Sequence, residues 1–141
     1  MNFEKSCGAL VVRRDKDQYY ILMIRHKAGG NRSFPKGHVE GNETEYETAL
    51  REVMEETSSR IAIVSDFRAT VSYRPSPGVM KEVVYFLAFT TSADIKAREG
   101  EIAEVEWVPL EKAEESLAHD NDKTVFRAAM ERMQRMTVEI K

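Results

Sequence analysis

Residues 37–61 read GHVEGNETEYETALREVMEETSSRI, and the rest of the chain is interpreted outward from this stretch. Its second half has the three-and-four spacing of an amphipathic helix. The predicted apolar face consists of Tyr46, Ala49, Leu50, Val53 and Thr57. Two N-caps are available, because Asn42 and Thr44 each have a glutamate three residues later, which is the spacing of a capping box.

Three glutamates gather on another side of this predicted helix. Glu52 lies three residues before Glu55 and four before Glu56, so the carboxylates are neighbours in space. Each such like-charge pair costs about 0.2–0.5 kcal/mol, and the helix dipole disfavours anions near the C-terminal end. A hard divalent cation relieves this repulsion, since Mg²⁺ prefers oxygen ligands and binds one or two carboxylates together with phosphate oxygens. A solvated acidic surface is the competing interpretation.

Three further residues stand at fixed intervals around the acidic cluster. Arg51 is expected on a different side of the helix from Glu55, where it can pair with Glu43 through a bidentate guanidinium fork. Gly37 allows a close backbone approach, so its carbonyl is a further candidate metal ligand. Six specified residues at these intervals occur by chance in roughly one chain of this length in ten thousand, which disfavours a plain acidic surface.

The segment resembles the Nudix box, G-x5-E-x7-R-E-U-x-E-E-x-G-U, where U is a bulky aliphatic residue. The matching residues are Gly37, Glu43, Arg51, Glu52, Val53, Glu55 and Glu56. Ser58 stands where the box has Gly, and Ser59 stands where it has an aliphatic residue. In the family that Gly ends the helix in a left-handed conformation, so Ser58 is expected either to cost stability or to shift the helix end.

The resemblance implies hydrolysis of a phosphoanhydride with Mg²⁺ as the cofactor and Mn²⁺ as the alternative. The implied metal ligands are Gly37, Glu52, Glu55, Glu56 and Glu101, and the implied catalytic residues are Glu52, Glu55, Glu101, Arg51 and Glu43. Glu101 enters because several Nudix enzymes have an acid six residues before the position of Trp107, with Glu104 as the competing candidate. Either Glu52 or Glu101 is expected to act as the general base.

Two further stretches resemble the asymmetrical diadenosine tetraphosphate hydrolases, a branch of the same family. They are FPKGHVE at residues 34–40 and KEVVYFLA at residues 81–88. The resemblance implies that Lys81 contacts phosphate and that Tyr85 lies beside the nucleotide, although Tyr85 also suits an ordinary sheet core. The expected substrate contacts are Arg32, Lys36, His38, Lys81 and Tyr85, with a loop-orienting role as the alternative for His38. Many members of the branch have Trp in the place of Arg32.

The remaining chain predicts strands mixed with helices. Strands are expected at residues 6–14, 19–25, 61–73, 81–90 and 101–108, with an interruption near Ser65. Helices are expected at residues 111–117 and from Asp120 or Asp122 to Met136. This pattern predicts an α/β fold, and the resemblance implies a Nudix-type α/β/α sandwich with a mixed sheet, in one domain over residues 1–141.

The composition limits which cellular compartment and which classes of partner are expected. The chain has 141 residues and a net charge of −3, and its basic residues form no run of the kind that binds nucleic acid. Neither a membrane span nor a signal core is evident. The lone Cys7 lies in an apolar run, which indicates a buried thiol in a reducing compartment. We expect a soluble cytoplasmic protein, and the sequence does not determine its oligomeric state.

The expected substrate is a small nucleotide in which a nucleoside diphosphate is linked to another group. Diadenosine tetraphosphate, cut asymmetrically to ATP and AMP, is the first choice by resemblance. Nucleoside triphosphates, nucleotide sugars, capped RNA ends and diphosphoinositol phosphates are alternatives with the same chemistry. A nucleotide-binding sensor without catalysis is a different class, which the retention of all three box carboxylates disfavours.

Overall fold

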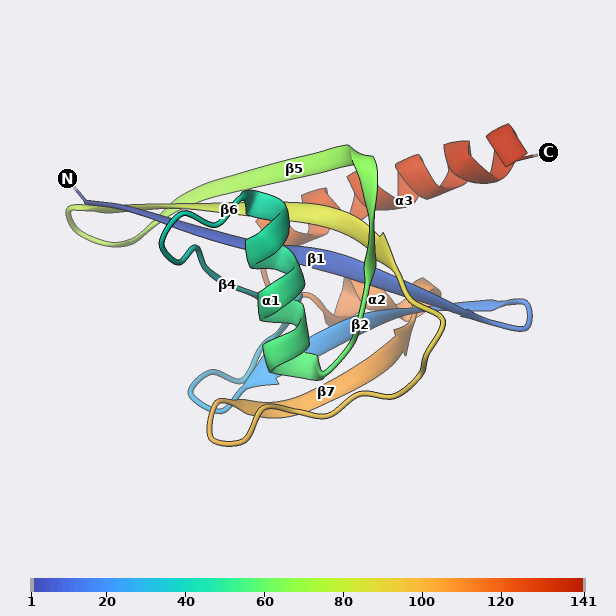
Figure 1. Ribbon diagram of the computed structural model, residues 1–141, viewed down its shortest axis with the longest axis horizontal. Coiled ribbons are helices and arrows are strands. Elements are labelled where there is room, and N and C mark those ends of the chain that lie inside the picture. The colour runs from blue at the N-terminus through green and yellow to red at the C-terminus, as the bar shows by residue number, and fades with distance from the viewer. Residues whose placement is uncertain (1, 141) are drawn as a thin grey trace.

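The computed structural model describes residues 2–140, apart from the side chains of Ser65 and residues 137–140. Within them, a mixed sheet lies between α1 on one face and α2 and α3 on the other (Figure 1), which confirms the expected α/β sandwich. The elements follow the chain as β1 Asn2–Asp15, β2 Gln18–His26, β3 Arg32–Ser33, β4 Lys36–His38, α1 Glu45–Thr57, β5 Ala62–Ser76, β6 Val79–Phe89, β7 Ile102–Pro109, α2 Leu110–Ser116 and α3 Asp120–Ile140.

The sheet is built around β1. This strand pairs in parallel with β6 from Asn2 to Val12 and antiparallel with β2 at its other end. The strand order is β3-β2-β1-β6-β5, with β7 paired to β2 and β4 paired to β1. A parallel pair needs a crossover, and here the chain between β1 and β6 includes α1. The helix α1 lies over β1 on one face of the sheet (Figure 1), and β4 pairs with residues 6–8 of β1 within the sheet.

Alternate residues of β1 pack into two different cores, as the two-residue period of a strand requires. Leu10 and Val12 pack with Val125 and Phe126 of α3. Ala9 and Val11 pack on the other face, in the cluster that contains Val53 of α1 and Leu22. Full burial of such side chains stabilises a fold by roughly 1.5–3 kcal/mol each. The stripe of α3 that the sequence assigned to the core is therefore buried against the sheet.

Several element boundaries differ from the prediction. The strands β3 and β4 were not predicted, because they are too short to show a period and are held by pairing with β2 and β1. The interruption expected near Ser65 is present as a register shift between Ile63 and Arg68, within the single strand β5. The predicted loop at residues 74–80 is a tight hairpin, in which Gly78 adopts a φ of 79°.

The helix α1 is rotated relative to its predicted apolar face. Tyr46 and Leu50 are 41% and 43% exposed, whereas Glu52 and Glu56 are buried with Ala49, Val53 and Thr57. Tyr46 nevertheless stacks on the buried ring of Phe86 of β6, with ring centroids 4.6 Å apart. The apolar-face prediction is wrong for Leu50, and α1 packs against β4 as well as β1, which turns two carboxylates inward. The predicted capping box is confirmed at Thr44, whose Oγ1 accepts the N–H of Glu47 at 3.1 Å.

The C-terminal end of α1 keeps its expected position although the box glycine is replaced. Ser58 has a φ of 63°, and its N–H donates to the carbonyl of Met54 at 2.9 Å. The helix end is therefore not shifted, and a residue with a Cβ occupies a left-handed conformation that costs about 1–2 kcal/mol. Ser59 is 3% exposed, and its hydroxyl has no hydrogen-bond partner among the described residues.

Cys7 is buried, which confirms the prediction from the sequence. Its side chain is fully inaccessible, and burial raises the pKa of the thiol to about 11. No helix in the described part of the chain has the length and apolar character needed to cross a membrane.

Candidate active site

The short strand β4 lies against both α1 and β1, and two glycines permit this contact. A side chain at Gly37 would overlap the carboxylate of Glu52. A side chain at Gly8 of β1 would overlap the carbonyl of Pro35 and the Cβ of Lys36. The carboxylate of Glu52 therefore rests directly on the backbone of Gly37, and this arrangement leaves no room for a larger residue at either glycine.

Arg51 joins the loop before α1 to the carboxylates on the helix. Its Nε and Nη2 donate to the two carboxylate oxygens of Glu43 at 2.7 and 3.0 Å, so the predicted pair is confirmed. Nη2 also donates to the carbonyl of His38 at 2.9 Å. Nη1 donates to Glu52 at 2.6 Å and to Glu55 at 3.1 Å. The expectation that Arg51 faces away from Glu55 is wrong, because residues four apart are neighbours on a helix surface.

The carboxylates of this cluster differ in the direction of their pKa shifts. The hydrogen bonds from Arg51 lower the pKa of Glu43 to about 2. Burial raises the pKa of Glu56 to about 8, although its Oε1 accepts the backbone N–H of Lys36 at 3.0 Å. Burial also raises the pKa of Glu52. Acids with raised pKa values in one place indicate a functional site, because such desolvation is costly in a purely structural helix.

The loop before β7 crosses the C-terminal end of α1. The backbone N–H of Arg98 donates to the carbonyl of Glu56 at 3.2 Å, and so satisfies a group that a helix end leaves unpaired. The Nη1 of Arg98 lies 3.3 Å from Glu55 Oε2 and 3.3 Å from Glu101 Oε2. This loop therefore brings Glu101 to the carboxylates of α1, where its charge helps to raise the pKa of Glu56.

The residues around Gly37 suit a hard divalent cation. Within residues 2–140 no three acidic or imidazole side chains already converge as a ligand set. Each glutamate is instead hydrogen-bonded within the protein, because Arg51 donates to Glu52 and Glu55 and the Lys36 N–H donates to Glu56. The donors are nevertheless carboxylate oxygens that repel one another, which is the chemistry that Mg²⁺ or Mn²⁺ relieves. The donor set therefore fits the metal.

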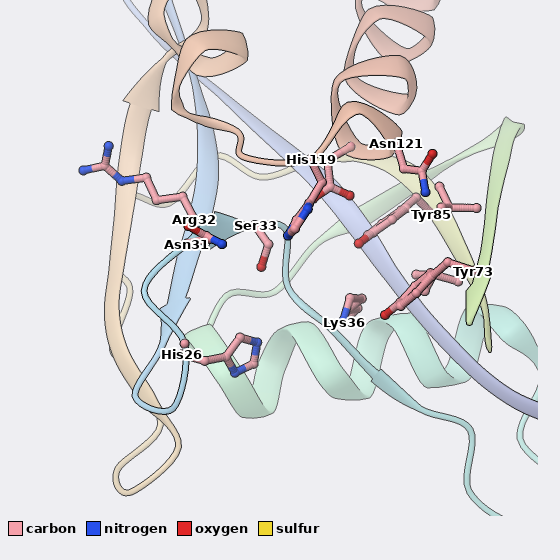
Figure 2. Close-up of a pocket in the computed structure, with 13 residues that line it drawn as sticks. His26, Asn31, Arg32, Ser33, Lys36, Tyr73, Tyr85, His119 and Asn121 are labelled. Carbon is pink, nitrogen blue, oxygen red and sulfur yellow. The ribbon is translucent and has the colours of Figure 1, made fainter. Parts of the chain in front are cut away.

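A cavity of about 450 Å³ lies beside β4 (Figure 2). Tyr73 of β5 and Tyr85 of β6 extend into it, and His119 and Asn121 reach it from the segment that begins α3 (Figure 2). The full lining consists of His26, Gly29, Asn31, Arg32, Ser33, Lys36, Val71, Tyr73, Val83, Tyr85, His119, Asn121 and Asp122. Its volume falls in the range of about 300–1,000 Å³ that is typical of small-molecule sites.

Comparison with known proteins identifies this arrangement. Residues 3–129 match the family model described as the NUDIX domain. The chain belongs to the Nudix family. It is a Nudix hydrolase, and Nudix hydrolases act on small nucleotide substrates and generally use divalent metals such as Mg²⁺.

Relatives of this Nudix hydrolase include enzymes of two descriptions. It is 33% identical over 122 residues to the asymmetrical bis(5′-nucleosyl)-tetraphosphatase of Mus musculus, covering 77% of this chain and 81% of that one. It is also 33% identical over 112 residues to an 8-oxo-(d)GTP phosphatase of Mycolicibacterium smegmatis, covering 79% of this chain but only 34% of the relative. In fold it is similar to a C. elegans Ap4A hydrolase in a binary complex, with a TM-score of 0.85, 24% identity, and coverage of 93% and 98% of the two chains.

The predicted substrate contacts of the Nudix hydrolase lie in different places. Lys36 and Tyr85 line the cavity, where Tyr85 is 1% exposed and packs edge-on against Phe34 with ring centroids 5.7 Å apart. Arg32 lines it too, but its Nε donates to Glu106 at 2.5 Å and its guanidinium points away from the tyrosines (Figure 2).

The other two predicted contacts lie outside the cavity lining. His38 is exposed, and its carbonyl instead anchors Arg51, which agrees with the loop-orienting alternative. Lys81 is half-buried, and both burial and the nearby Lys36 lower its pKa. Of the two candidate acids before Trp107, Glu101 reaches the carboxylates of α1, whereas Glu104 forms an ion pair with Arg25.

Several lining residues were missed by sequence reasoning, among them Tyr73, His119 and Asp122. Tyr73 stands at the end of a predicted strand with no motif around it, and Asp122 was interpreted only as a helix cap. His119 was interpreted as a linker, and it does lie between α2 and α3 as well as facing the cavity. Their position depends on how α3 docks against β5, and no local sequence pattern reports such a contact.

Proposed function

We propose that the chain hydrolyses a phosphoanhydride bond of a bis(5′-nucleosyl) tetraphosphate in a Mg²⁺-dependent reaction, cutting diadenosine tetraphosphate to ATP and AMP. One nucleoside occupies the cavity and the polyphosphate extends over β4 to the carboxylates of α1. The relatives named as asymmetrical tetraphosphatases support this choice of substrate.

The main support for the proposal is that Lys36 contacts both the carboxylates of α1 and the cavity. Its backbone N–H donates to Glu56 at 3.0 Å, while the residue also lines the cavity. The carboxylates and the cavity are therefore adjacent, separated by one residue of β4. A substrate with a base at one end and phosphates in the middle has this same distribution of apolar and anionic parts.

The protein groups divide the chemical work. Glu52, Glu55, Glu56 and Glu101, with the carbonyl of Gly37, are the proposed metal ligands. When bound, Mg²⁺ neutralises charge on the phosphoryl oxygens and acidifies a water molecule. Glu52 or Glu101 accepts the proton of the attacking water.

Other residues hold the substrate and the catalytic groups in place. Lys36 and Lys81 bind phosphate oxygens as point charges, Tyr73 contacts the base through its exposed ring, and Tyr85 forms the wall of the nucleoside site. Arg51 and Glu43 fix the loop against α1, and so hold the glutamates at a constant distance from β4. Positioning of this kind accounts for much of the catalysis in phosphoryl transfer.

The test is a turnover assay with the nucleotides separated by ion exchange. Purified protein with Mg²⁺ and diadenosine tetraphosphate should release ATP and AMP in equal amounts, and Glu55→Gln should reduce the rate at least tenfold. Glu115→Gln on the exposed side of α2 is the matched control and should retain the rate. Release of two ADP molecules, or metal-independent turnover, would contradict the proposal.

A nucleoside triphosphate is the second candidate substrate, because one relative is named as an 8-oxo-(d)GTP phosphatase. The shared chain is only 34% of that relative's length, so this candidate ranks below the first. The same assay separates the two, since turnover of triphosphates with no products from the tetraphosphate would favour the second.

A further inference from the structure

The loop before β7 fixes the backbone of Arg98 against the C-terminal end of α1. The N–H of Arg98 donates to the carbonyl of Glu56 at 3.2 Å, and its carbonyl accepts the N–H of Ile102 at 3.0 Å. Two residues earlier, the N–H of Lys96 donates to the carbonyl of Thr57 at 2.9 Å. None of these bonds involves a side chain, so the position of the Arg98 backbone does not depend on what its guanidinium contacts.

The guanidinium of Arg98 lies between two carboxylates of the candidate active site. Its Nη1 is 3.3 Å from Glu55 Oε2 on α1 and 3.3 Å from Glu101 Oε2, and these are its ion pairs among the described residues. Both distances exceed the about 2.7–2.9 Å that is typical of a charge-assisted hydrogen bond to a carboxylate. The Arg98 side chain is 46% exposed, so water screens both pairs and they contribute little to stability. Arg98 therefore exchanges these partners readily.

Arg51 is attached in a different way. Its guanidinium donates to both oxygens of Glu43 and to the carbonyl of His38, none of which is a proposed metal ligand. Those bonds remain when the glutamates of α1 turn to a cation. No described residue gives Arg98 a bond of this kind, and a cation that takes its two carboxylates also repels it. Arg98 is therefore the group that leaves the carboxylates when they bind metal.

The released guanidinium stays beside the cavity because its backbone is fixed. The N–H of Lys27 donates to the carbonyl of Glu101 at 3.1 Å, and the preceding residue, His26, lines the cavity. A polyphosphate that runs from the cavity to the carboxylates of α1 passes this point. Its oxygens are anions that a planar guanidinium fork binds well, and they replace the charge that Glu55 and Glu101 no longer offer to Arg98.

We propose that Arg98 is a polyphosphate-binding residue that Glu55 and Glu101 mask in the metal-free protein, and that it transfers to the phosphate chain when these carboxylates bind Mg²⁺. This inference rests on the proposed function in taking the cavity and the α1 carboxylates as parts of one nucleotide site. It adds a residue to that site and an order to its assembly, because Arg98 meets phosphate only after the metal has taken its carboxylates. The effects of Arg98 on metal affinity and on nucleotide affinity therefore have opposite signs.

The test combines two titrations of the whole protein. Mn²⁺ is titrated without nucleotide and followed by electron paramagnetic resonance. The bismethylene analogue of ATP, in which CH₂ groups replace both phosphate-bridging oxygens and prevent hydrolysis, is titrated by calorimetry in excess Mg²⁺. Arg98→Gln should bind Mn²⁺ about 2-fold to 5-fold more tightly than wild type, because a weak ion pair no longer competes. It should bind the analogue at least about 10-fold more weakly, because a hydrogen bond to a charged group is lost.

Arg127→Gln is the matched control. Arg127 is an exposed arginine that donates to both oxygens of Glu114 outside the cavity lining, so this variant loses the same charge from a comparable ion pair. It should keep the wild-type affinities for Mn²⁺ and for the analogue.

Several results would overturn the inference. Weaker Mn²⁺ binding by Arg98→Gln would mean that Arg98 orders the loop, and unchanged Mn²⁺ binding would mean that the carboxylates do not mask it. Unchanged binding of the analogue, or no binding of it by wild type, would mean that Arg98 does not hold phosphate.

The turnover assay with diadenosine tetraphosphate judges the proposed function separately. Hydrolysis by a wild-type protein whose affinity for the analogue is unchanged in Arg98→Gln would remove the inference alone. Opposite shifts in the two affinities without any turnover would remove the proposed function alone.

Discussion

Replacement of the buried Glu56 by glutamine should make the metal-free protein more stable, and increasingly so as the pH rises. Burial raises the pKa of Glu56 from an ordinary value of 4.5 to about 8. Between these pH values the unfolded chain has lost the proton that the folded chain keeps, so the free energy of unfolding falls as the pH rises. Glutamine has no proton to lose, keeps nearly the same volume, and can still accept the Lys36 N–H.

The magnitude follows from the two pKa values. Each pH unit between them costs about 1.4 kcal/mol, so the difference between variant and wild type should reach about 3 kcal/mol at pH 7 and about 4–5 kcal/mol above pH 8. At pH 5 both states of wild type are close to their proton-bound limits, and the difference should be below about 1 kcal/mol.

The measurement is urea unfolding in EDTA at pH 5, 7 and 9, with wild type, Glu56→Gln and Glu55→Gln. Glu55 is exposed, and removal of its charge should change stability by less than about 1 kcal/mol. Groups far from α1 titrate equally in all three proteins and cancel in the differences, whereas Glu52 is coupled to Glu55 and to Glu56 and contributes to both variants. A Glu56→Gln effect that stays within about 0.5 kcal/mol from pH 5 to pH 9 would refute the reasoning, because it would mean that burial does not hold the proton.

Three further predictions concern the same region. Ser58→Gly should raise the free energy of unfolding by about 0.5–1 kcal/mol in urea, because the left-handed strain exceeds the entropy cost of glycine, whereas Ser58→Ala should not stabilise. Gly37→Ala should displace Glu52 and lower kcat/KM at least tenfold while the circular dichroism spectrum persists; full activity would contradict the close packing. Arg98→Ala should tighten Mn²⁺ binding, followed by electron paramagnetic resonance titration, because the guanidinium competes for Glu55; weaker binding would show that Arg98 orders the loop instead.

The fold was predictable where the sequence carries periods and caps. The long apolar runs of β1, β2 and β6 predicted strands, and Thr44 with Glu47 predicted the start of α1. The orientation of α1 was not predictable from its own residues. Periodicity assigned Leu50 inward, whereas contact with β4 turned Glu52 and Glu56 inward instead. A three-residue strand has no period of its own, so its effect on the helix cannot be seen in the sequence.

In the candidate site too, features set by local spacing were predictable and contacts between distant residues were not. The acidic cluster and the Arg51–Glu43 pair were predicted because their spacing is local and specific. The cavity is assembled from β2, β3, β4, β5, β6 and α3 with their connecting loops, and its residues Tyr73, His119 and Asp122 carry no shared motif. The ion pair of Arg32 with Glu106 was missed for the same reason, since the two residues lie 74 positions apart.

The contact of Lys36 with both the cavity and Glu56 has a thermodynamic consequence. In the proposed complex, a nucleotide in the cavity would act on the side chain of Lys36, and a cation at the carboxylates would act on its N–H through Glu56. If nucleotide binding draws β4 toward the cavity by even a fraction of an ångström, the hydrogen bond to Glu56 lengthens and that carboxylate becomes freer to bind metal. Linkage then requires the reciprocal effect, so the metal must increase nucleotide affinity by the same factor. The strand would thereby make the two binding events cooperative, and the enzyme would assemble its reactive complex preferentially when both ligands are present.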